Sequence, residues 1–179
     1  MKHTISVIVE NKPGVLQKVA GLFSRRGFNI ESLAVGTTEN PEISRMTIVV
    51  EGDEAVLEQI TKQLHKLIDT LKVFDLPPEK LVERELSLIK VHANEKTRQE
   101  ITQIVDIFKG KIVDVAEDSL TIEISAEKDK VDSMQKLLEK FGIQELVRTG
   151  KIALQKGPST SPSILRSSGS KDSGQGGKE

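Results

Sequence analysis

The fold of this chain is decided by one stretch, Ser6-Val7-Ile8-Val9-Glu10-Asn11-Lys12-Pro13-Gly14-Val15-Leu16. Its β-branched start predicts a strand, its Asn-Lys-Pro-Gly centre predicts a tight turn, and its end predicts the first turn of a helix. A turn that opens a helix offers unpaired backbone N–H groups at the positive end of the helix dipole. The stretch therefore indicates a site for a small anion, such as the carboxylate of an amino acid.

Outward from this stretch, the first half of the chain predicts the element order βαββαβ. Alternating β-branched residues are typical of strands, and apolar residues at every third or fourth position are typical of a helix with one buried face. Gly27 ends the first predicted helix, and Asp53 caps the second. The predicted strands are residues 4–10, 29–35, 44–51 and 71–76, and the predicted helices are residues 16–26 and 56–68.

Pro77-Pro78 marks a boundary, because two prolines cannot continue a strand ladder. Beyond it the same order repeats, with strands at 85–93, 111–116, 120–125 and 143–148, helices at 101–108 and 131–141, and residues 151–154 extending the last strand. The prediction is a first domain over 1–76, a linker over 77–84, a second domain over 85–156, and a disordered tail over 157–179, rich in Gly, Ser, Pro and charge.

The repeated order predicts an α+β fold of two ferredoxin-like βαββαβ domains. Each unit closes as a four-stranded antiparallel sheet with both helices on one face. The other sheet face still carries Val and Ile, and the sheet edges are open. A unit this small with an uncovered face requires a partner, so we expect a homodimer.

Composition excludes several classes of function. The chain of 179 residues has no cysteine, which excludes disulfides and thiolate chemistry, and its 26 basic residues balance 27 acidic ones. No apolar run reaches the length of a membrane span, and the N-terminus leads directly into a strand, so we expect a cytoplasmic protein without a membrane partner. The predicted strands 44–51 and 85–92 carry no aromatic residue for base stacking, which argues against a nucleic-acid partner.

The candidate ligand-binding residues lie in the turn and at the start of the second strand. The N–H groups of Gly14, Val15 and Leu16 could hold a carboxylate, and the amides of Asn11 and Asn29 could meet an amino group. The simpler alternative is an ordinary turn capped by Asn11, with Asn29 in an Asx turn at a helix end. The residues alone leave both alternatives open.

No catalytic or metal-binding constellation emerges. His3, His65 and His92 are scattered without metal-ligand spacing, and pairs such as Glu58 and Lys62 are typical of a solvated helix face. Acyl-phosphate hydrolysis, which ferredoxin-like folds can host, requires an arginine in a phosphate-binding turn. This turn holds lysine and proline instead, so we expect no metal and no catalytic residue.

Beyond these patterns, the chain resembles a known family. Residues 10–16 and 22–33, above all the run Phe28-Asn29-Ile30-Glu31-Ser32-Leu33, resemble the ACT-domain regulatory (small) subunits of acetolactate synthase, also called acetohydroxyacid synthase. The resemblance continues through residues 44–48, 57–64, 82–86 and 107–115, and it covers residues 1–156 approximately.

The resemblance implies an N-terminal ACT domain, a second ferredoxin-like domain and no active site. It implies a partner, the large catalytic subunit, which would carry thiamine diphosphate, Mg and FAD, while this chain would carry no cofactor of its own. The small subunit would raise the activity of that enzyme and confer feedback inhibition by a branched-chain amino acid, with valine the first candidate.

The resemblance also implies that the effector lies between the ACT domains of a homodimer. Asn11, Pro13, Gly14, Val15 and Leu16 of one subunit would hold it, and Asn29 and Ile30 would reach in from the other. The alternative is a freestanding amino-acid-sensing ACT protein that regulates a different partner. Residues 157–179 match nothing in the family, and we expect their deletion to leave binding unchanged.

Overall fold

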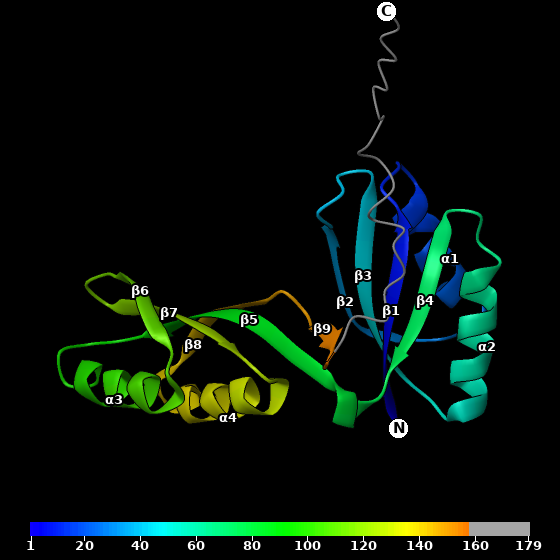
Figure 1. Cartoon of the computed structure of the whole chain (residues 1–179). Helices are drawn as coiled ribbons and strands as arrows, with labels where there is room; N and C mark the ends of the chain where they lie inside the picture. The colour runs from blue at the N-terminus through cyan, green and yellow to red at the C-terminus, as the bar shows by residue number, and fades with distance from the viewer. Residues whose placement is uncertain (158–179) are drawn as a thin grey trace, which may run out of the picture.

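The computed structural model describes residues 1–157 as two antiparallel sheets, each with helices packed on one face (Figure 1). The N-terminal unit contains β1 (Lys2–Glu10), α1 (Val15–Arg25), β2 (Ile30–Thr37), β3 (Ile43–Glu51), α2 (Glu54–His65) and β4 (Thr70–Leu76). Its strands lie in the order β2-β3-β1-β4. This arrangement confirms the predicted βαββαβ order and the α+β fold class.

The core of the N-terminal unit lies between the sheet and its two helices. Alternate residues of β1, such as Ile5 and Val7, are fully buried, because successive side chains of a strand point to opposite faces. They pack against the apolar stripes of α1 and α2, which include Phe23 and Ile60. With few aromatic residues available, β-branched and aliphatic side chains fill this core.

The C-terminal unit repeats this design. It contains β5 (Leu81–His92), α3 (Arg98–Phe108), β6 (Lys111–Val115), β7 (Ser119–Ala126), α4 (Lys128–Leu138), β8 (Ile143–Arg148) and β9 (Ile152–Gln155), with short 3-10 turns at Pro78–Lys80 and Glu139–Phe141. The strand order is β6-β7-β5-β8, the same pattern as in the first sheet. Its core, which includes Ile89, Ile122 and Met134, is separate from that of the first unit.

Two strands differ from the sequence prediction by more than one or two residues at an end. Strand β5 begins at Leu81 rather than at residue 85, and β9 is a separate strand rather than an extension of β8. Both differences have one cause, because residues 81–84 pair antiparallel with β9, for example Val82 with Leu154. The pairing is long-range in sequence, so no local pattern indicates it. Figure 1 shows the resulting β5–β9 ribbon beside the first sheet.

The β5–β9 ribbon corrects the expectation of a wholly uncovered sheet face. Leu81 and Ala153 of the ribbon form a buried cluster with Leu76 of β4, and Phe74 packs against it. Phe74 pairs with Ser6 and therefore points away from the helices. The chain thus covers part of this face itself.

The predicted disordered tail spans residues 157–179, and all of it except Gly157 lies outside the described part of the chain. Among the described residues, no helix is long and apolar enough to cross a membrane.

Candidate functional site

The predicted turn between β1 and α1 has the geometry that the sequence indicates. Gly14 is the N-cap of α1 and has a φ of 84°, a left-handed conformation that favours glycine. A Cβ placed on Gly14 would meet no atom of residues 1–157 within 4 Å. The backbone in front of α1 is therefore open to an incoming ligand.

Several backbone donors at this helix start are free. Among the described residues, the N–H groups of Gly14 and Leu16 have no acceptor, whereas that of Val15 makes a long 3.3 Å hydrogen bond to the Lys12 carbonyl. In the described part of the chain no side chain caps the helix, and its first turn holds no acidic residue. The positive end of the helix dipole is therefore uncompensated, which favours an anion.

Buried Asp69, which follows α2, holds the turn in place through contacts with β1 and α1. The Glu10 N–H donates to the Asp69 carbonyl at 2.9 Å, and Lys18 of α1 forms a 2.5 Å ion pair with the Asp69 carboxylate. Asn11 is fixed from the other side, since its Nδ2 donates to the Pro41 carbonyl at 2.8 Å. The Asn11 amide N–H₂ thus holds the turn, and its carbonyl oxygen is the atom left for a ligand.

The side chains of the turn divide into a buried group and an exposed group. Val15 is only 4% exposed and belongs to the core, so it can offer a ligand nothing but its backbone. Pro13 is exposed, and Leu16 is 45% exposed, which gives the turn an apolar surface beside its N–H groups. The turn thus presents backbone N–H donors beside an apolar surface.

Asn29 and Ile30 lie at the opposite end of the same sheet. Ile30 pairs with Val50, which pairs with His3 at the start of β1, whereas the turn follows Glu10 at its end. At about 3.3 Å per residue, His3 and Glu10 are about 23 Å apart. One copy of the chain therefore does not bring the two halves of the predicted site together.

Strand β2 forms a free edge of the first sheet in the described structure, since it pairs with β3 alone. Its last residue, Thr37, pairs with Ser44, which pairs with Val9 next to the turn. The two ends of β2 thus lie level with the two halves of the predicted site.

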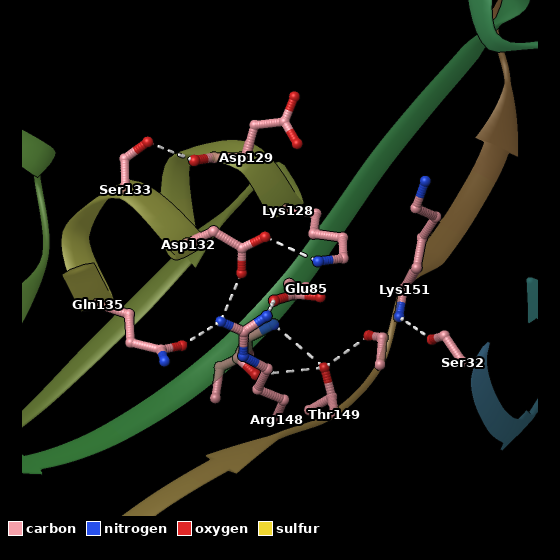
Figure 2. Close-up of polar contacts among 12 residues, drawn as sticks. Ser32, Glu85, Lys128, Asp129, Asp132, Ser133, Gln135, Arg148, Thr149 and Lys151 are labelled. Atoms are coloured by element: carbon pink, nitrogen blue, oxygen red, sulfur yellow. Dashed lines mark hydrogen bonds and ion pairs between the residues drawn. The ribbon is translucent and has the colours of Figure 1, made fainter. Parts of the chain in front are cut away.

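The structure also reveals a contact between the two units that sequence reasoning missed. The Lys151 N–H, in the turn between β8 and β9, donates to the Ser32 Oγ of β2 at 2.9 Å (Figure 2). The contact borders a cavity of about 440 Å³ lined by Lys2, Glu31, Ser32, Leu33, Val49, Glu85, Lys128, Arg148, Thr149, Gly150 and Lys151. The only local signal is the Thr149-Gly150-Lys151 sequence, which marks a turn but indicates no partner.

Three charged residues of the C-terminal unit line this cavity, namely Glu85, Lys128 and Arg148. They belong to the cluster of polar contacts drawn in Figure 2. Arg148 forms ion pairs with Asp132 at 2.6 Å and with buried Glu85 at 3.2 Å, and it donates to Gln135 at 2.6 Å. A hydrogen bond from Lys128, then one from Arg148, lowers the pKa of Asp132 below its usual range, against the opposing effect of burial. The cluster ties α4 to β5 and β8.

A second cavity, of about 370 Å³, lies between the first sheet and the β5–β9 ribbon. Its lining is largely apolar, with Ala34, Val35, Gly36, Thr37, Arg45, Thr47, Val82, Arg84, Ile152, Ala153 and Leu154. Neither of these two cavities includes the residues of the predicted site. Among the described residues, no three His, Asp or Glu side chains gather in a way that could hold a metal ion.

The fold and the free helix start define a class, that of two-domain α+β regulatory proteins with an N-terminal ACT domain. A model of the "AHAS small subunit-like ACT domain" matches residues 5–72, and one of the "Small subunit of acetolactate synthase" matches residues 84–157. The chain belongs to the family of acetolactate synthase small subunits, which confirms the resemblance. It is a non-catalytic regulatory subunit in branched-chain amino acid biosynthesis.

Individual relatives agree with this assignment over nearly their whole length. The probable acetolactate synthase small subunit of Archaeoglobus fulgidus is 59% identical over 88% of this chain and 98% of its own. The acetolactate synthase small subunit of Mycobacterium leprae is 51% identical over 87% and 92%. The crystal structure of the Thermotoga maritima small subunit superposes with a TM-score of 0.84, at 45% identity over 89% of this chain and 99% of that one.

Proposed function

We propose that this protein binds the large catalytic subunit of acetolactate synthase, raises its activity and makes it sensitive to a branched-chain amino acid, valine in the first instance. Thiamine diphosphate, Mg and FAD belong to the catalytic partner in this proposal. The described chain itself supplies a regulatory domain with a free helix start. No acid–base pair or nucleophile is needed for that role.

The effector site in this proposal is shared by two copies of the chain. The observation that carries it is the separation of the turn and Asn29 at opposite ends of one sheet, beside the free edge of β2. If two β2 edges pair antiparallel about a two-fold axis, the Ile30 end of one copy faces the Thr37 end of the other. Asn29 and Ile30 of one copy then come close to the turn of its partner.

Each group at the shared site has a role that follows from its chemistry. The free N–H groups of Gly14 and Leu16 receive the effector carboxylate, and the side-chain oxygens of Asn11 and of the partner's Asn29 accept from its ammonium group. Pro13 and the exposed side chain of Leu16 border the aliphatic part of the ligand. Val15 anchors the start of α1 to the core through its buried side chain.

A shared site explains how binding could change activity. An amino acid that contacts both copies binds only the dimer arrangement that brings the two halves together, so it favours that arrangement. If the large catalytic partner is most active with a different arrangement, effector binding and activation oppose each other. Couplings of this kind are typically about 1–3 kcal/mol.

The test is a titration followed by reconstitution. Calorimetry of the isolated protein with valine, with leucine and isoleucine as controls, should give saturable binding near one valine per chain. Acetolactate formation by the large catalytic partner should then rise when this protein is added and fall when valine is added. The proposal fails if the protein neither binds any of the three amino acids nor changes that rate.

The alternative, a freestanding amino-acid sensor with another partner, shares the effector site but not the catalytic partner. The match of residues 84–157 to the second family model, which describes the acetolactate synthase small subunit, favours the enzyme complex. Co-purification with a thiamine diphosphate enzyme would support the complex, and repeated co-purification with an unrelated protein would support the alternative.

A further inference from the structure

Strand β2 is irregular at the point where it leaves the proposed effector site. Ile30 pairs with Val50 and Ser32 pairs with Val49, so Glu31 is an extra residue that forms a β-bulge. A bulge bends its strand and redirects the side chains beside it. The direction in which Asn29 and Ile30 point therefore depends on what holds this bulge.

Besides the β2–β3 backbone pairing on either side, the N-terminal unit restrains the bulge through one exposed ion pair. Glu31 forms a 2.6 Å ion pair with Lys2, but the two side chains are 29% and 55% exposed. Solvent screens exposed pairs of this kind, so this pair adds little to the stability of the bulge. A second restraint comes from the C-terminal unit.

That restraint is the turn between β8 and β9, residues 149–151, which we call the β8–β9 turn. Lys151 donates its backbone N–H to the Ser32 Oγ at 2.9 Å, directly beside the bulge. A Cβ on Gly150 would lie 2.8 Å from the Ser32 Oγ and 3.3 Å from the Leu33 carbonyl oxygen, and Gly150 has a φ of 80°. Only glycine satisfies both the close approach and the backbone conformation.

The β8–β9 turn is itself firmly attached to the C-terminal unit. Thr149 exchanges hydrogen bonds with Leu86, since its N–H donates to the Leu86 carbonyl at 3.0 Å and its Oγ1 accepts from the Leu86 N–H at 3.1 Å. The Lys151 ammonium forms a 2.6 Å ion pair with Glu83. The Arg148 cluster precedes the turn, as Figure 2 shows. A turn held at both ends can fix the position of what it touches.

We propose that the β8–β9 turn positions the effector site, by holding the β2 bulge through Ser32 and Gly150. Asn29 and Ile30 then reach the partner's turn in the orientation that binding requires. This inference rests on the proposed function, because it concerns the same effector. In this inference the C-terminal domain affects the affinity for the effector without touching the effector itself.

Reciprocity gives the contact a second consequence. If the β8–β9 turn favours effector binding, effector binding must favour the closed contact by the same factor. Valine should therefore slow hydrogen exchange of the Lys151 amide, although Lys151 lies outside the proposed binding residues. The hydrogen bond of this amide links the N-terminal and C-terminal domains, so a conformational change in one domain alters the contact with the other.

The test compares Ser32→Ala and Gly150→Ala with two matched controls in the full chain. Ser125→Ala removes an exposed hydroxyl from β7, and Gly157→Ala adds a Cβ at a similar φ of 85°, with no atom of the described residues within 4 Å. Calorimetry with valine should show affinity about five-fold or more weaker in Ser32→Ala and Gly150→Ala, at the lower end of typical couplings, and unchanged affinity in both controls. Exchange of the Lys151 amide should be faster in Ser32→Ala and slowed by valine in the wild type.

The outcomes separate this inference from the function it rests on. If the wild type binds valine and Ser32→Ala binds it equally well, with the same Lys151 exchange, the inference is wrong while the effector site stands. If the wild type binds none of the three amino acids, the effector proposal fails and takes this inference with it. Should Gly150→Ala fold poorly, Ser32→Ala alone decides, because it removes one hydroxyl and adds no bulk.

Discussion

At the residue scale, the proposed effector site depends on one glycine that any side chain would disturb. Gly14 combines a left-handed φ of 84° with an unobstructed approach and a free N–H group. Substitution by an ordinary residue would strain the backbone and block the ligand at once. Asp and Asn tolerate left-handed conformations better than most residues, and they differ from each other mainly in charge.

We therefore expect Gly14→Asp to weaken valine binding more than Gly14→Asn. Both variants add similar bulk, but only aspartate places a negative charge beside the effector carboxylate. Two like charges about 4 Å apart in water repel by about 1 kcal/mol, which corresponds to roughly five-fold in affinity. Valine calorimetry on the two variants measures the difference. Equal affinities in both would argue against a carboxylate at this turn.

A second residue-scale prediction concerns Asp132, whose pKa is lowered by hydrogen bonds from Lys128 and Arg148. A carboxylate with a lowered pKa stabilises the folded state above its unfolded pKa of about 3.9, and it loses this contribution as the pH falls through its lower folded value. The side chain is 42% exposed, so screening limits the effect to about 1 kcal/mol or less.

Asp132→Asn should accordingly lower the free energy of unfolding near pH 7, and the gap to the wild type should close below about pH 4. Urea denaturation at a series of pH values measures this gap. A gap that stays constant from neutral pH down to about pH 2 would show that the loss comes from packing rather than from charge.

At the element scale, local patterns predicted the strands and helices well, whereas long-range pairing escaped them. Periodicity located all four α-helices of the described chain to within a few residues, since each has a distinct apolar face. The β5–β9 ribbon could not be predicted, because residues 81–84 pair with a strand some seventy positions away. The Ser32–Lys151 contact escaped for the same reason, with 119 positions between its partners.

Helix α4 offers a direct check on this assignment of faces. Leu138 is fully buried and Leu137 is 47% exposed, although they are neighbours in the chain. Leu138→Ala should lower the free energy of unfolding by about 2–5 kcal/mol, through lost burial and the cavity left behind. Leu137→Ala should cost less than about 1 kcal/mol. Urea denaturation of both variants tests the prediction, and similar losses would mean that the helix faces are wrongly assigned.

At the scale of the whole molecule, sequence sufficed for the fold class and the family, but not for the way the two domains meet. The turn residues 11–16 were recognisable from Pro13, Gly14 and the strand before them. What sequence patterns could not give is the separation of that turn from Asn29 within one chain, because it follows from strand register. That separation is what makes a dimer necessary for the proposed site.

A shared site predicts complementation between two defective variants. Gly14→Asp disrupts the turn, and Asn29→His removes the side chain that is proposed to contact the partner's turn. Each homodimer of either variant therefore contains two damaged sites. A mixed dimer contains one doubly damaged site and one intact site, since the intact turn and the intact Asn29 come from different chains. With random exchange of protomers, the mixture should recover about a quarter of the wild-type sites.

The most direct measurement is therefore valine calorimetry on Gly14→Asp, on Asn29→His and on their mixture after exchange of protomers. A shared site predicts weak or no binding in each variant alone. The mixture should regain sites of wild-type affinity, at about a quarter of the wild-type number. If confirmed mixed dimers regain no binding, or if either variant alone binds valine like the wild type, the effector is not held between Gly14 of one chain and Asn29 of another.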